Sequence, residues 1–106
     1  MVQRTNKNIR LIKKFKEDVK KNIKIDRFVF FGSRVKGKFK RYSDFDILIV
    51  SSDFKGVLWY KRPTNFYLMW KEDYPLELLC YTPEEFKRKS KKIGIVSEAI
   101  KEGIDI

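Results

Sequence analysis

The stretch that decides the fold is FVFFGSRVKGKFKRYSDFDILIV, residues 28–50. Its apolar runs predict a buried strand over residues 28–31 and a second buried strand over residues 44–50. The second strand begins with Asp44 and Asp46. Side chains two residues apart on a strand point to the same face, so these two carboxylates are expected to lie together.

A turn made of Gly32 and Ser33 follows the first strand. Glycine lets a backbone approach a ligand closely, and the N–H groups and serine hydroxyl at a helix start can donate to a phosphate. The alternative is an ordinary strand-to-helix turn with Ser33 as the N-cap. Of the cations that follow, we single out Arg34 as a triphosphate ligand and expect the others to be solvated: Lys36, Lys38, Lys40 and Arg41.

Asp44 and Asp46 have two interpretations. An isolated Asp-x-Asp favours a polar strand start at an exposed edge. Here the strand continues as apolar on both faces and a Gly-Ser turn precedes it, which favours a functional site. Carboxylate and phosphate oxygens together suit Mg²⁺, and two metal ions about 3.5–4 Å apart bracket the attacking and leaving oxygens of a displacement at phosphorus. The pattern therefore predicts a site for a metal-bound nucleotide triphosphate.

Glu77 lies in an apolar segment, PLELLCY, that predicts a third strand over residues 76–81. A carboxylate in such a strand is costly unless it is paired or binds a metal. If this strand lies beside the second one, Glu77 completes a cluster of three carboxylates, as metal ligand and general base. The alternative is an edge strand with Glu77 in water.

The first helix is predicted over residues 6–23, where apolar residues recur at three- and four-residue spacing, with Thr5 or Asn6 as its N-cap. A loop follows the second strand over residues 51–56, and residues 57–60 suggest a helical turn.

Three further helices follow. One is expected from Pro63 to about residue 71. Thr82, Pro83 and Glu85 form a capping box that opens a helix to about residue 92. The last spans residues 95–102 and stops at Gly103. The fold class predicted is α/β (α+β), a small mixed sheet with helices packed on it.

The composition bounds the remaining alternatives. The 106 residues suit one domain, and the formal charge of +11 favours polyanionic partners such as nucleotides or RNA. The absence of histidine excludes His-based acid–base chemistry, and the lone Cys80 excludes a disulfide framework. No apolar run reaches the ~20 residues of a membrane span, and the N-terminus lacks the apolar core of a signal peptide. We expect a cytoplasmic protein that does not enter membranes.

The spaced motif Gly32-Ser33-x-x-x-Gly37, followed by Ser43-Asp44-x-Asp46, resembles the signature of the DNA polymerase beta-like nucleotidyltransferase superfamily. More narrowly, the whole chain is similar to the minimal nucleotidyltransferases, single small domains of about this size. The resemblance implies a polymerase beta-like fold over residues 1–106. It also implies that Gly32 and Ser33 bind the triphosphate, that Asp44 and Asp46 bind Mg²⁺, and that Glu77 takes the third acidic position, which is often Asp in relatives.

The resemblance further implies transfer of a nucleoside monophosphate, such as AMP from ATP, to a hydroxyl acceptor with release of pyrophosphate. Many minimal nucleotidyltransferases are antitoxins of separate HEPN-domain ribonuclease toxins, which they neutralise by binding or by adding AMP to a tyrosine. A HEPN-type partner protein is therefore the expected acceptor.

Two other classes stay open at this stage. One is a non-catalytic antitoxin or nucleotide-binding module that masks a partner. The other is a basic RNA-binding domain, which is weaker because the strands lack an exposed aromatic pattern. Five aromatic residues are many for so small a domain, and we expect most in the core and the rest on a homodimer or partner surface: Phe54, Trp59, Tyr60, Tyr67 and Trp70.

Overall fold

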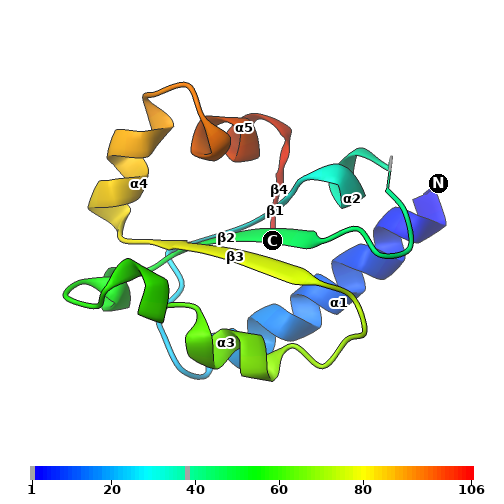
Figure 1. Cartoon of the computed structure of the whole chain (residues 1–106), viewed down its shortest axis with the longest axis horizontal. Helices are drawn as coiled ribbons and strands as arrows, with labels where there is room; N and C mark the ends of the chain where they lie inside the picture. Colours follow the sequence, from blue (N-terminus) through cyan, green and yellow to red (C-terminus); the bar gives the residue numbers. More distant parts are fainter. Residues whose placement is uncertain (1, 38) are drawn as a thin grey trace.

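A computed structural model of the chain describes residues 2–37 and 39–106, so Lys38 lies outside the described residues. Its centre is a mixed sheet with the strand order β3-β2-β1-β4. Figure 1 shows this sheet between two groups of helices, with α4 and α5 on one side and α1 and α3 on the other. The α+β fold class expected from the sequence is confirmed.

The two inner strands are β1 (Arg27–Phe31) and β2 (Phe45–Val50), which pair antiparallel. Both are almost wholly buried because each has helices on both faces. Strand β3 (Leu76–Tyr81) pairs parallel with β2 and forms one edge of the sheet. A short strand that the sequence did not predict, β4 (Ile104–Asp105), pairs with β1 at the opposite edge.

Alternating side chains of the strands divide the core into two parts. Phe45, Ile47 and Ile49 of β2 pack with apolar residues of α1 (Val2–Lys20) and α3 (Thr64–Met69). Leu48 of β2 faces the other side, toward α4 (Pro83–Ser90) and α5 (Ile95–Glu102). The predicted division of the second strand into two apolar faces is confirmed.

Helix boundaries differ from the sequence predictions mainly at the N-terminus. Helix α1 begins at Val2, so Thr5 and Asn6 lie inside it and the prediction that either caps it is wrong. Polar residues before an apolar stripe suit a cap, but they are also tolerated within a helix. The capping box of α4 is confirmed in full, with Thr82 and Glu85 bonding to each other's backbone N–H.

The connection between β2 and β3 holds two 3₁₀ turns, η1 (Ser52–Phe54) and η2 (Trp59–Lys61), before α3. The expectation that most of its aromatic residues lie in the core is wrong for three of them. Trp59, Tyr60 and Tyr67 are 73%, 56% and 41% exposed, because they line an open groove beside β3 and do not point into the core. Phe54 is buried and Trp70 packs against the core.

Cys80 is buried and free. Among the residues that the structure describes, no helix has the length and apolarity that crossing a membrane requires.

Candidate active site

The pairing of β2 with β3 places three carboxylates together. Asp46 is the register partner of Glu77, and Asp44 lies immediately before β2. One oxygen of each carboxylate lies within 4.8 Å of the others. The predicted cluster of Asp44, Asp46 and Glu77 is therefore present. Glu77 is also exposed and on an edge strand. Its position therefore combines the two interpretations, membership of the carboxylate cluster and exposure to water at a sheet edge.

The setting of the cluster disfavours the ionised form of Asp46. The pKa of Asp46 is raised to about 6, first because partial burial removes water from the carboxylate and then because Glu77 and Asp44 repel it. The described residues form no ion pair with Asp44, Asp46 or Glu77. Three oxygen donors that lack a cation partner match the ligands that hard divalent cations such as Mg²⁺ prefer. The residues present thus fit a divalent cation.

Gly32 ends β1 directly beside this cluster. Its φ of 91° is a conformation that side chains rarely adopt. A Cβ at this position would overlap the carboxylate of Asp46, so the close approach of backbone to Asp46 requires glycine. Helix α2 (Ser33–Lys36) begins at the next residue. Within this turn, the N–H groups of Val35 and Lys36 donate to the carbonyl of Gly32. Those of Ser33 and Arg34, at the first two positions, have no acceptor within the helix.

Arg34 has a role that the sequence did not indicate. Its side chain is buried, and it donates hydrogen bonds to the backbone carbonyls of Ser43 (2.9 Å) and Arg41 (3.0 Å). Burial lowers its pKa. These contacts hold the loop that ends at Asp44. They favour a positioning role for Arg34, while its predicted contact with triphosphate stays a prediction.

Three aromatic rings enclose the Arg34 guanidinium: Phe39, Phe45 and Tyr74, at 4.7, 4.2 and 4.6 Å from the guanidinium carbon to the ring centroid. Among the described residues Arg34 forms no ion pair with a carboxylate, and such cation–π packing compensates its buried charge. The sequence offers only one signal for the positioning role of Arg34, which is an arginine among the lysines of the basic connection. A planar guanidinium stacks on aromatic rings and donates in fixed directions, whereas an ammonium group is a compact, strongly hydrated charge.

Comparisons with known proteins assign the chain to a family. The model of the family described as "Nucleotidyltransferase domain" matches residues 12–102. No curated protein matches the chain.

The solved structures that resemble the chain include the following two. One is a protein of Sulfolobus solfataricus, provisionally assigned as a nucleotidyltransferase, with a TM-score of 0.69 and 19% identity over 98% of this chain and 83% of that one. The other is BolA1 from Arabidopsis thaliana, with a TM-score of 0.56 and 21% identity over 71% of this chain and 94% of that one. At these identities the structural likeness shows the fold alone, and the family match carries the assignment.

Proposed function

We propose a specific activity for this chain from the premise that it belongs to the nucleotidyltransferase domain family. The activity is Mg²⁺-dependent transfer of a nucleoside monophosphate, AMP from ATP in the first instance, to a hydroxyl group of an acceptor. The observation that carries this proposal is the cluster of Asp44, Asp46 and Glu77 beside Gly32, within 4.8 Å and with no cation partner among the described residues.

The carboxylates are proposed to hold the divalent cation, with Asp44 and Asp46 as its principal ligands and Glu77 as the third. When bound, such a cation neutralises charge that develops on phosphate oxygens. The raised pKa of Asp46 supports this role, because a carboxylate destabilised by its neighbours gains most from a bound cation.

The donor and acceptor are proposed to lie on opposite sides of the cluster. Gly32 and Ser33 lie on the β1 side and are proposed to bind the triphosphate through backbone N–H groups. Glu77 lies on the β3 side, where it accepts the proton of the acceptor hydroxyl. The hydroxyl oxygen forms a bond to the α-phosphorus, the bond from that phosphorus to the bridging oxygen breaks, and pyrophosphate leaves with the electron pair.

A second candidate is a module that masks a partner without catalysis, with a HEPN-type protein as the partner in either case. Its specific support is the exposure of two leucines in the segment between β2 and β3, since Leu58 and Leu68 are 53% and 77% exposed. Apolar side chains that gather on a surface mark interaction sites.

Calorimetry with ATP, with and without Mg²⁺, tests the proposal on wild type and on Asp44→Ala/Asp46→Ala. We expect binding that needs both the metal and the two aspartates. The matched control is Glu17→Ala/Asp73→Ala, which removes the same charge from exposed positions and should bind as wild type does. Binding that does not depend on metal, or no binding at all, would contradict the metal-dependent mechanism and favour the masking module.

A further inference from the structure

The three carboxylates of the cluster are not held in the same way. Asp46 and Glu77 are register partners in the parallel ladder of β2 and β3, so the sheet itself fixes them relative to each other. Asp44 lies immediately before β2 and outside that ladder. Contacts other than strand pairing must therefore set the distance from Asp44 to the other two carboxylates.

The backbone on both sides of Asp44 is hydrogen bonded. Before it, the carbonyl of Ser43 accepts a bond from Nε of Arg34 at 2.9 Å. After it, the N–H of Phe45 donates to the carbonyl of Pro75 at 2.8 Å. Arg34 belongs to α2, and Pro75 is the residue immediately before β3. The position of Asp44 thus depends on where α2 and the start of β3 lie relative to each other.

The side chain of Tyr74 joins these two elements. Its ring centroid lies 4.6 Å from the guanidinium carbon of Arg34 and 5.5 Å from the ring centroid of Phe45. The carbonyl of Tyr74 accepts a hydrogen bond from the indole N–H of Trp70 at 2.7 Å, which holds the backbone that carries the ring. Tyr74 therefore links the start of β3 to the arginine that binds the loop before Asp44.

We propose that Tyr74 is a positioning residue for the cation site, an inference that rests on the proposed function. By stacking on Arg34, its ring fixes Asp44, which is the carboxylate of the cluster that the sheet does not hold. Tyr74 contacts neither the cation nor the nucleotide in this proposal and acts only through the contacts of its neighbours. A desolvated cation–π contact corresponds to about 5- to 30-fold in an equilibrium constant, which sets the size of the expected effects.

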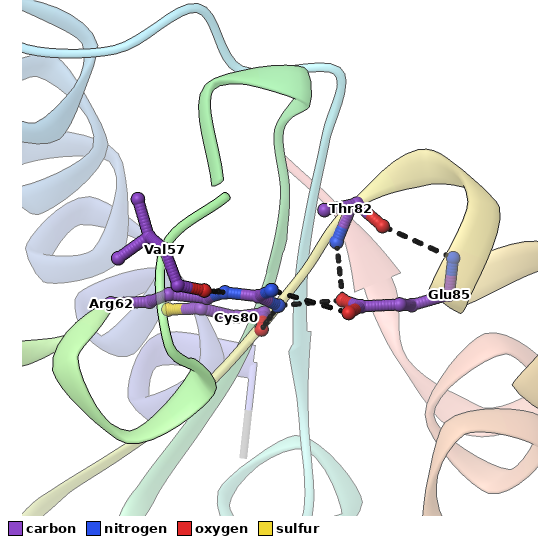
Figure 2. A network of polar contacts seen from close by, with 5 residues as sticks. All are labelled: Val57, Arg62, Cys80, Thr82 and Glu85. Atoms are coloured by element: carbon purple, nitrogen blue, oxygen red, sulfur yellow. Dashed lines mark hydrogen bonds and ion pairs between the residues drawn. The ribbon is translucent and has the colours of Figure 1, made fainter. Parts of the chain in front are cut away.

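A second buried arginine, Arg62, shows what an aromatic partner achieves for Arg34. Figure 2 shows the guanidinium of Arg62 bonded to the carboxylate of Glu85, so this pair neutralises both charges. An ion pair of the same kind between Arg34 and Asp44 would put a protein cation in the place proposed for the metal ion. Aromatic rings stabilise a buried guanidinium without a carboxylate. The stack on Tyr74 thus lets Arg34 hold the loop while Asp44 stays available as a ligand.

The alternative is that Tyr74 only packs against the core. It is partly buried beside Phe45 and Trp70, so its replacement lowers the free energy of unfolding under either role. The two roles differ in local quantities. A positioning role predicts local opening around Asp44 and weaker cation binding, and a packing role predicts neither beyond the global loss of stability.

Hydrogen exchange followed by NMR tests the position of Asp44 in metal-free protein. Tyr74→Leu should speed exchange of the Phe45 amide by about 5- to 30-fold relative to the amide of Ile47, which lies inside the ladder. Tyr74→Phe keeps the ring and should exchange as wild type does. The matched control is Phe54→Leu, which removes a buried ring from the same core and should change both amides alike.

Calorimetry with Mn²⁺ tests the consequence for the cation site. We expect Tyr74→Leu to weaken Mn²⁺ binding by about 5- to 30-fold. Tyr74→Phe and Phe54→Leu should leave the affinity within about twofold of that of wild type. Adding Tyr74→Leu to Asp44→Asn should weaken binding no further, because Tyr74 acts through Asp44.

Equal changes in Tyr74→Leu and Phe54→Leu would overturn the proposal, because they would show a packing role alone. So would a Tyr74→Leu effect on Mn²⁺ that persists in full in the Asp44→Asn background. Mn²⁺ binding by wild type that Tyr74→Leu leaves unchanged would contradict the positioning role and leave the proposed function standing. Wild type that binds no Mn²⁺ would contradict the proposed function, and exchange of the Phe45 amide would then decide alone whether Tyr74 fixes Asp44.

Discussion

Two carboxylate sites at the two ends of β3 lie in opposite electrostatic settings. At the start of the strand, Glu77 lies within 4.8 Å of Asp44 and Asp46, and the pKa of Asp46 rises to about 6. Just after its end, Glu85 accepts two hydrogen bonds from Arg62, and these bonds lower the pKa of Glu85 to about 2. The carboxylate of Glu85 is stabilised as an anion, and that of Asp46 is destabilised as an anion.

The difference separates a carboxylate that an arginine of the chain neutralises from a cluster that we propose to bind a cation. The chain has 25 lysine and arginine residues against 14 aspartate and glutamate residues, so cations to pair with are plentiful. Arg62 reaches Glu85 from 23 residues away. Arg34 lies close to Asp44 in sequence, yet its donors go to backbone carbonyls. Among the described residues no cation forms an ion pair with this cluster, which costs stability in so basic a chain. Such a cost is typical of a site for an external cation.

The largest expected effect comes from replacing one member of the unpaired cluster. Asp46→Asn keeps the shape of the side chain and removes its charge. We expect nucleotidyl transfer to fall by about 10³-fold or more, because the proposed divalent cation would lose one of its three carboxylate ligands. In the presence of a chelator, the free energy of unfolding should rise by about 0.5–2 kcal/mol, because repulsion with Glu77 and Asp44 is relieved.

Kinetics and urea denaturation measure the two halves of this expectation. Asp53→Asn would serve poorly as a control, since Asp53 accepts a bond from the Lys24 N–H. Asp73→Asn, at an exposed position, should change neither quantity. An Asp46→Asn protein that is both inactive and less stable would show that the carboxylate is structural, and it would remove the contrast between the two ends of β3.

Breaking the paired site should have the opposite signature. Arg62→Met leaves Glu85 without its cation and the carbonyls of Val57 and Cys80 without their donor. We expect the free energy of unfolding to fall by about 3 kcal/mol in urea denaturation. The double variant Arg62→Met/Glu85→Gln should recover part of this loss, because no unpaired charge remains. If Arg62→Met alone were neutral, the bridge would contribute only the surface value of an exposed pair.

Features that depend on neighbouring residues in the sequence could be predicted, and features that depend on contacts between distant residues could not. The strand over Leu76–Tyr81 and the helix over Ile95–Glu102 were predicted at their observed bounds, since local apolar patterns and glycines define them. The carboxylate cluster could be predicted once β3 was assumed to lie beside β2. The bridge from Arg62 to Glu85 could not, because the two residues share no local pattern.

Exposure of the aromatic residues was missed for a related reason. Trp59 and Tyr60 look like core residues by type, and only the path of the chain outside the edge of the sheet leaves them in solvent. Strand β4 was missed because two residues after a helix carry too little pattern to indicate pairing. Both errors concern where a segment lies in the fold, which depends on contacts between distant parts of the chain.

Arg34 gives a third, smaller expectation near the unpaired cluster. Arg34→Lys keeps the charge but cannot donate to both carbonyls while stacking on the rings, so the free energy of unfolding should fall by about 2 kcal/mol. ATP affinity should fall with it, because the loop before Asp44 loosens. Arg41→Lys, at an exposed position nearby, is the control. Unchanged stability with weaker ATP binding would instead assign Arg34 to direct phosphate contact.

The smallest expected effect is a difference in pH dependence between the two ends of β3. The folded pKa of Glu85 lies below its ordinary value of 4.5, so its bridge stabilises the fold fully above pH 4.5 and is lost as the pH falls toward 2. The stability difference between wild type and Glu85→Gln should therefore shrink by about 1–2 kcal/mol between pH 5 and pH 3 in urea denaturation.

Asp46 has a raised pKa, so in metal-free protein its charged carboxylate destabilises the fold above pH 6, and this destabilisation is relieved as the pH falls below that value. The stability difference between Asp46→Asn and wild type should accordingly shrink already between pH 7 and pH 5, where that of Glu85→Gln stays constant. If both differences changed over the same pH range, the two carboxylates would not differ in setting as the contacts indicate.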